Sequence, residues 1–119
     1  ANPAADQALI RQQSESLPTV QQAAATVLGV APLRVEVRSL AHQLTVSVVD
    51  ATDANASSRS HDAEAVVGSV ERAIDGHRGF DQVMLIHVDF VSHHGKGGRI
   101  LKGFDFNRSP SGSFVPHKT

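Results

Sequence analysis

The chain has 119 residues, a formal net charge of −1, 40% hydrophobic residues and 19% charged residues. This length is that of one domain, and the composition is typical of a globular chain rather than a disordered one. The absence of Cys, Trp and Tyr excludes a disulfide framework, a thiolate metal site and a cysteine nucleophile. Polar chemistry in this chain therefore depends on seven His, twelve carboxylates and eleven basic residues.

The N-terminal quarter of the chain has helical spacing. Apolar residues recur every three or four positions over residues 4–28, which predicts helix. Pro18 interrupts this pattern, and because proline is tolerated in a first turn, it predicts the start of a second helix. Ser16 is then the expected N-cap of that helix, and Gly29 supplies its end.

Two alternating segments follow. Residues 33–39 and 44–50 each place apolar side chains at every second position, which is the pattern of a half-buried strand. Only residues 40–42 separate the two segments, so we expect a β-hairpin.

Residues 60–76 predict another helix. Its apolar residues form one stripe at three-and-four spacing, Ser60 is the expected N-cap, and Gly76 ends the pattern.

Residues 82–91 are apolar at most positions on both faces, which is typical of a central strand. A glycine-rich turn leads to a fourth strand over residues 99–107.

These elements predict a single α+β domain over residues 1–119, in the order α-β-β-α-β-β. We expect a two-layer sandwich, in which helices cover one face of a four-stranded, largely antiparallel sheet. Residues 1–3 and 108–119 are expected to be loose ends.

The face opposite the helices carries the most specific functional prediction. Period-two alternation places on it Arg34, Glu36, Arg38, Thr45, Ser47, His87, Asp89, Asp105 and Asn107. Such a face fits a solvated surface, a dimer interface or the floor of a ligand groove. Arg34, Glu36 and Arg38 are therefore candidate ligand-binding residues together with His87 and Asp89.

His87 and Asp89 are the candidate catalytic pair. Residues two apart on a strand share a face, and a carboxylate beside an imidazole orients the ring for proton transfer or metal ligation. With His93 and His94 they are also the candidate metal ligands, although adjacent histidines point to opposite sides of an extended chain. No cofactor motif is present, and we expect no cofactor. The simpler interpretation is a polar pair that interacts across the sheet with Arg34 or Arg38.

Charge is distributed unevenly along the chain. Residues 1–91 carry six Arg and no Lys against eleven carboxylates, a net charge of −5. Residues 92–119 carry five basic residues against Asp105 alone, a net charge of +4. Lys96 and Arg99 in the glycine-rich turn are candidate anion ligands, and a solvated basic end is the simpler interpretation. Because the whole chain has almost no net charge, nucleic acid is not an expected partner.

The sequence does not determine the cellular compartment of the protein. No apolar run is long enough to span a bilayer. The first five residues fit a mature N-terminus after export to the periplasm or the medium, and a cytoplasmic location fits equally.

We expect a small, non-enzymatic binding or assembly domain of bacterial type. It would self-associate through the open sheet face or an edge strand, or bind a protein or a small anionic ligand. One alternative is a small hydrolase or metal-dependent enzyme centred on His87 and Asp89. A second alternative is the binding of an anion or polyanion by the basic C-terminal hairpin.

Overall fold

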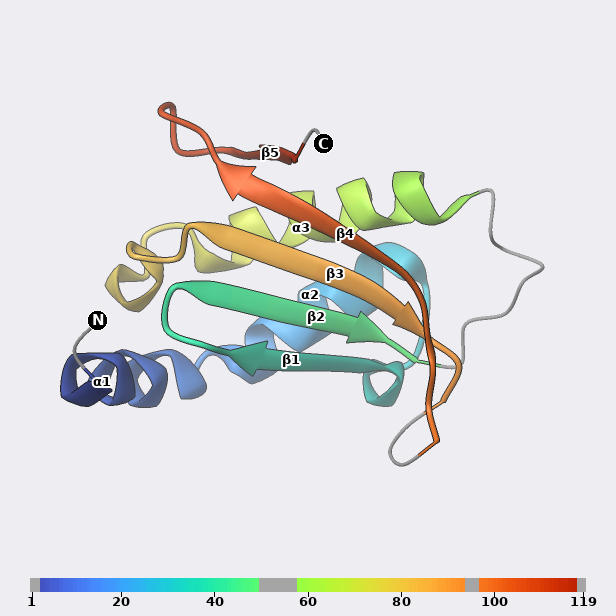
Figure 1. Ribbon diagram of the computed structural model, residues 1–119, viewed down its shortest axis with the longest axis horizontal. Helices are drawn as coiled ribbons and strands as arrows, with labels where there is room; N and C mark the ends of the chain where they lie inside the picture. The colour runs from blue at the N-terminus through green and yellow to red at the C-terminus, as the bar shows by residue number, and fades with distance from the viewer. Residues whose placement is uncertain (1–2, 50–57, 94–96, 118–119) are drawn as a thin grey trace.

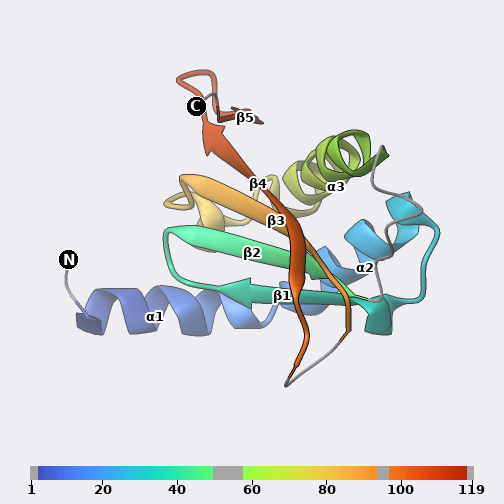
Figure 2. The ribbon, with the colours of Figure 1, turned by 45° about the vertical axis from the view of Figure 1, so that its right-hand side comes forward.

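Three helices and a five-stranded sheet form the part of the chain that the structure, a computed structural model, describes: residues 3–49, 58–93 and 97–117 (Figure 1). The elements are α1 (Pro3–Ser14), α2 (Leu17–Leu28), the 3₁₀ turn η1 (Pro32–Arg34), β1 (Val35–Ser39), β2 (Gln43–Val48), α3 (Arg59–Ile74), the 3₁₀ turn η3 (Arg78–Phe80), β3 (Leu85–Val91), β4 (Ile100–Arg108) and β5 (Phe114–Pro116). The predicted α+β class is confirmed, and α2 and α3 lie side by side on one face of the sheet (Figures 1 and 2).

The order of the strands in the sheet follows their order in the chain. The β1–β2, β3–β4 and β4–β5 pairs are antiparallel, whereas β2 and β3 are parallel. The chain leaves β2, returns through α3 to the starting end of the sheet, and therefore enters β3 in the direction of β2. The predicted count of four strands was one too low. Three of the four strand pairs are antiparallel, and the parallel β2–β3 pair, which was not predicted, makes the sheet mixed.

The fifth strand lies in the segment that the sequence predicted to be a loose end. β5 pairs with the last residues of β4, which end at Arg108. The Arg108 guanidinium donates hydrogen bonds to the carbonyl oxygens of Val83 (2.7 Å), Phe80 (3.1 Å) and Gly112 (3.3 Å). It also lies 4.6 Å from the centre of the Phe114 ring. Arg108 thus holds β5 and the preceding turn against the body of the domain.

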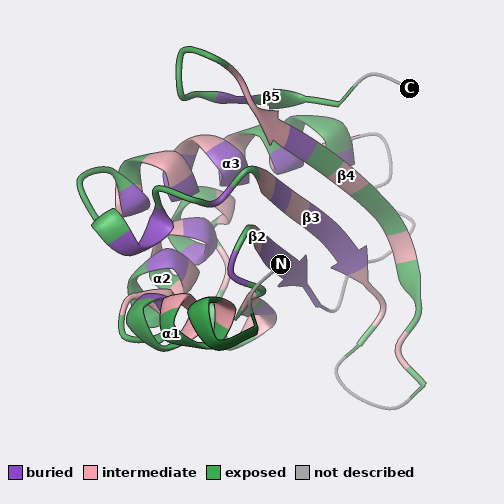
Figure 3. Ribbon diagram, turned by 60° about the vertical axis from the view of Figure 1, so that its left-hand side comes forward, coloured by how far each residue is buried: buried purple, intermediate pink, exposed green. Residues whose placement is uncertain are grey.

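The hydrophobic core lies between the sheet and the inner sides of α2 and α3 (Figure 3). Five residues of the apolar stripe predicted for α3 are buried, namely Ala63, Val66, Val67, Val70 and Ile74, and the sixth, Ala73, is partly buried at its edge. The stripe packs with Val20 and Ala24 of α2 over the apolar side chains of the central strands. The cap position of α3 is Ser58 rather than Ser60, so the helix begins two residues earlier than the predicted cap implied.

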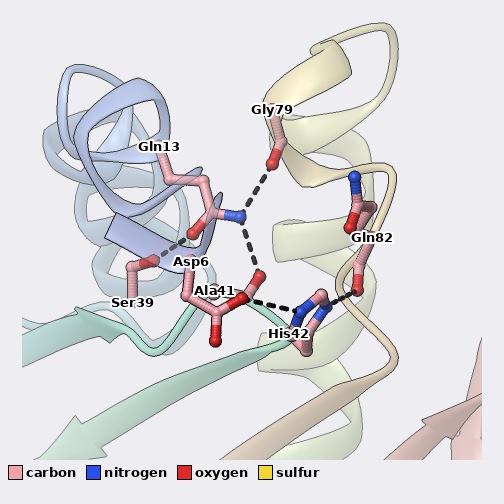
Figure 4. Close-up of polar contacts among 7 residues, drawn as sticks. All are labelled: Asp6, Gln13, Ser39, Ala41, His42, Gly79 and Gln82. Atoms are coloured by element: carbon pink, nitrogen blue, oxygen red, sulfur yellow. Dashed lines mark hydrogen bonds and ion pairs between the residues drawn. The ribbon is translucent and has the colours of Figure 1, made fainter. Parts of the chain in front are cut away.

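Polar contacts attach α1 to the domain (Figure 4). Gln13 is the only residue of α1 that is buried. Its amide nitrogen donates to the carbonyl oxygens of Ala41 (2.9 Å) and Gly79 (2.7 Å), and its amide oxygen accepts a hydrogen bond from the Ser39 hydroxyl. One side chain thereby joins α1, the β1–β2 turn and η3.

Candidate functional site

Seven of the nine polar residues predicted to share a face lie in two rows across adjacent strands. The first row contains Arg38, Thr45, His87 and Asp105, and the second contains Glu36, Ser47, Asp89 and Gly103. Both rows lie on the sheet face away from α2 and α3, because the other positions of the same strands form the core. The centre of this face is less exposed than the sequence suggested, since Thr45, Ser47 and Asp89 are buried.

His87 lies between two carboxylates. Its Nδ1 is 2.6 Å from Asp105 Oδ1, and its Nε2 is 3.2 Å from Asp89 Oδ2. An ionised carboxylate only accepts hydrogen bonds, so both contacts are hydrogen bonds only when both ring nitrogens carry hydrogen. The structure thus brings together the predicted pair and adds Asp105 from β4 as a third member.

The two carboxylates have different surroundings. The side chain of Asp105 is 47% exposed and that of Asp89 only 5% exposed. Asp89 Oδ1 is buried and has no hydrogen-bond partner among the described residues. Loss of the His87 contact would therefore leave the carboxylate of Asp89 buried without compensation.

Gly103 provides the space that the His87 ring occupies. A Cβ atom at Gly103 would lie 3.0 Å from Cε1 and 3.4 Å from Nε2 of His87. The ring cannot move away freely because a carboxylate contacts each of its nitrogens. The absence of a side chain at position 103 is therefore part of this arrangement.

The arrangement links strands, and its two β4 positions, Gly103 and Asp105, also line a cavity of about 310 Å³. The lining of this cavity and of the other large cavities does not include His87 or Asp89. Among the described residues, no group of three or more His, Asp or Glu side chains is placed to hold a metal ion. The hydrolase centred on His87 and Asp89 stays a prediction, and the observed contacts join β3 to β4.

Other predicted site residues lie apart from His87. The Arg34 guanidinium donates to the Val49 carbonyl oxygen at 3.2 and 3.3 Å, at the opposite end of β1 from Arg38. His93 lies beyond the end of β3 with its ring beside Gly97, and Arg99 precedes β4. His94 and Lys96 lie outside the described residues. Arg108 is one of the five basic residues of the predicted basic C-terminal segment. Its guanidinium donates hydrogen bonds to three carbonyl oxygens of the domain.

A second surface lies on the opposite side of the molecule. α2 and α3 form the walls of a groove of about 760 Å³. Its lining is Pro18, Thr19, Gln22, Ala23, Thr26 and Val27 from α2 with Ser69, Arg72 and Ala73 from α3. Val27 is 40% exposed there. We call this surface the α2–α3 groove.

Polar side chains in the α2–α3 groove bond mainly within their own helices. Gln22 donates to the Thr26 hydroxyl at 3.3 Å, and the Ser69 hydroxyl donates to the Val66 carbonyl oxygen at 2.7 Å. Arg72 Nη1 lies 3.7 Å from the position that a Gly68 Cβ would take, one turn back along α3. The groove therefore presents methyl and methylene groups while these polar groups keep their partners.

Hydrophobic periodicity does not identify the α2–α3 groove, although the sequence carries a signal for it. Residues 16–33 contain no Asp, Glu, Lys, Arg or His, in a chain that is 19% charged. The exposed side of a surface helix normally carries charged residues. An outward helix face without charges is therefore an indication of a binding surface.

No protein-family model, curated protein or solved structure matches this chain. Within the described residues, no helix has both the length and the apolar character needed to cross a membrane.

Proposed function

We propose that this chain is a non-enzymatic binding domain whose binding surface is the α2–α3 groove. The ligand is an amphipathic protein helix with an uncharged contact face. The observation that supports this proposal most directly is the groove itself, which has Arg72 as its single charged lining residue. Open apolar grooves on soluble domains are typical binding sites for helices.

The dimensions of the groove suit a helix. α2 has 12 residues, which corresponds to a length of about 18 Å. Thr19, Ala23 and Val27 are spaced by four residues along it and form a ridge of small and medium side chains. A helix laid beside this ridge would contact α2 and α3 simultaneously.

The surfaces favoured by the sequence are less suited to binding. The sheet face carries the half-exposed carboxylate of Asp105 beside the His87 ring, and burial of this carboxylate by a partner would cost solvation free energy. At the β1 edge, the Gln21 amide donates to the Val35 carbonyl oxygen at 2.9 Å. The other edge strand, β5, is short and ends at Pro116, and both features oppose strand addition.

A peptide titration tests this proposal. A synthetic peptide with the sequence of residues 16–33 serves as the uncharged helical probe, and backbone amide shifts of the isotope-labelled full chain report its binding. We expect shift changes at Thr26 and Ala73, with His87 unaffected. A control peptide carrying Ala23→Glu should bind at least tenfold more weakly. Equal binding of the two peptides, or changes centred on the sheet face, would contradict the proposal.

A further inference from the structure

We infer that the helix bound in the α2–α3 groove is α2 of a second copy of this chain, so that the domain forms a symmetric dimer. This inference rests on the proposed function, since it names the partner at the same surface. The chain carries both halves of such an interface: a groove without a carboxylate in its lining and, on the same helix, an uncharged ridge.

The charge distribution favours a second copy over a charged partner. A partner helix with ammonium groups on its contact face would have to desolvate them with no carboxylate in the lining, and partner carboxylates would find Arg72 alone as an opposite charge. α2 has neither an acidic residue in its first turn nor a basic residue in its last. Arg72 is exposed at the α3 wall, where its guanidinium remains hydrated when the groove is filled.

Symmetry fixes the arrangement of the two helices. Soluble homodimers are mostly two-fold symmetric, and a two-fold axis uses the same patch of both copies. Ala23 is the middle residue of the Thr19, Ala23 and Val27 ridge. An axis at Ala23 makes the two α2 helices antiparallel, so that Ala23 faces its counterpart and Thr19 faces Val27 of the other copy.

The side chains at the centre allow a close approach. Ala23 has a single methyl group, and helices that meet at such residues lie about 8 Å apart. Gln22 donates to Thr26 within α2, and this hydrogen bond can be kept when the helix of the second copy packs beside them. Ser69 and Ala73 on α3 form the far wall, against which the helix of the second copy packs.

Disulfide cross-linking tests the register directly, because the chain has no native cysteine. We expect Ala23→Cys to form an intermolecular disulfide rapidly under mild oxidation, because a disulfide needs Cα atoms within about 7 Å. Thr19→Cys alone should cross-link poorly, since two such positions lie about 12 Å apart along the helices. A mixture of Thr19→Cys and Val27→Cys should cross-link efficiently.

The control for cross-linking is Gln7→Cys, at an exposed position on α1 outside the groove. Cross-linking at position 23 that is no faster than at position 7 would overturn the inference. So would efficient cross-linking of Thr19→Cys alone, because it requires a different register.

Sedimentation separates failure of this inference from failure of the proposed function. The native chain should change from monomer to dimer between micromolar and millimolar concentration, and Ala23→Glu should abolish the dimer. Gln7→Glu, which adds the same charge outside the groove, should leave it intact. A native chain that is monomeric throughout but still binds the uncharged peptide would overturn the dimer alone. A monomer that does not bind the peptide would overturn both proposals.

Discussion

Asp105 Oδ1 lies 2.6 Å from Nδ1 of His87 across the β3–β4 pair, and Asp89 contacts the other side of the same ring. The contact with Asp89 is the more protected, because its carboxylate is almost completely buried. The three residues therefore form a polar link within the sheet, and their role in stability can be measured by substitution.

The first prediction concerns the dependence of Asp89 on His87. His87→Leu should lower the free energy of unfolding by about 3 kcal/mol, because it leaves a buried carboxylate without its partner. The double variant His87→Leu with Asp89→Leu should recover most of this loss, since it removes the charge as well. Urea denaturation of the native chain, both single variants and the double variant measures the coupling. If the losses of unfolding free energy in the two single variants add up to the loss in the double variant, the two side chains do not depend on each other.

The second prediction compares two glycines. Gly103→Ala should destabilise the fold by roughly 1 kcal/mol, because the new methyl group lies 3.0 Å from Cε1 of His87. Gly68→Ala should stabilise it by about 0.5–1 kcal/mol, because Gly68 lies within α3 and its nearest contact is Arg72 Nη1 at 3.7 Å. Thermal unfolding of both variants checks these opposite signs. Destabilisation by Gly68→Ala, or an unchanged stability for Gly103→Ala, would contradict the described packing.

The third prediction concerns the attachment of α1. Gln13→Ala removes the donor to the carbonyl oxygens of Ala41 and Gly79 and the acceptor for Ser39. We expect a loss of about 2 kcal/mol, because buried polar groups lose their partners. In the Gln13→Ala variant, amide hydrogen exchange should become faster in α1 by a larger factor than in α3, relative to the native chain. Gln7→Ala, at an exposed position of α1, is the control and should have little effect on exchange.

The fourth prediction concerns the C-terminal segment. Arg108→Lys keeps the charge but cannot form the same three hydrogen bonds to Phe80, Val83 and Gly112, because an ammonium lacks the planar guanidinium geometry. We expect β5 to exchange its amide hydrogens at least tenfold faster in this variant. Lys102→Arg, at an exposed position of β4, should leave β5 unchanged. Equal protection of β5 in both variants would show that Arg108 does not anchor it.

Local patterns predicted much of this structure. The stripe of α3 and the alternation of β1 to β4 were sufficient to assign the two sheet faces and to place His87 beside Asp89. Asp105 was assigned to the correct face, but its contact with His87 depends on the β3–β4 register, which alternation does not specify.

The remaining features depend on tertiary packing. β5 has three residues, too few for a repeating pattern, and its contacts are tertiary: it pairs with β4, its Phe114 ring lies against Arg108, and the Phe114 N–H donates to Glu71. The parallel β2–β3 pair depends on the route of the chain through α3. The α2–α3 groove was missed because periodicity identifies the buried side of a helix, whereas this surface is identified by charges that are absent from the other side.

A dilution series followed by backbone amide resonances tests the central claim that the α2–α3 groove, rather than the polar sheet face, is the binding surface. As the concentration of the native chain rises, the amides of Ala23, Thr26 and Ala73 should shift together, while those of His87 and Asp105 remain unchanged. Concentration-dependent shifts confined to His87, Asp105 and their neighbours in the sheet would contradict it.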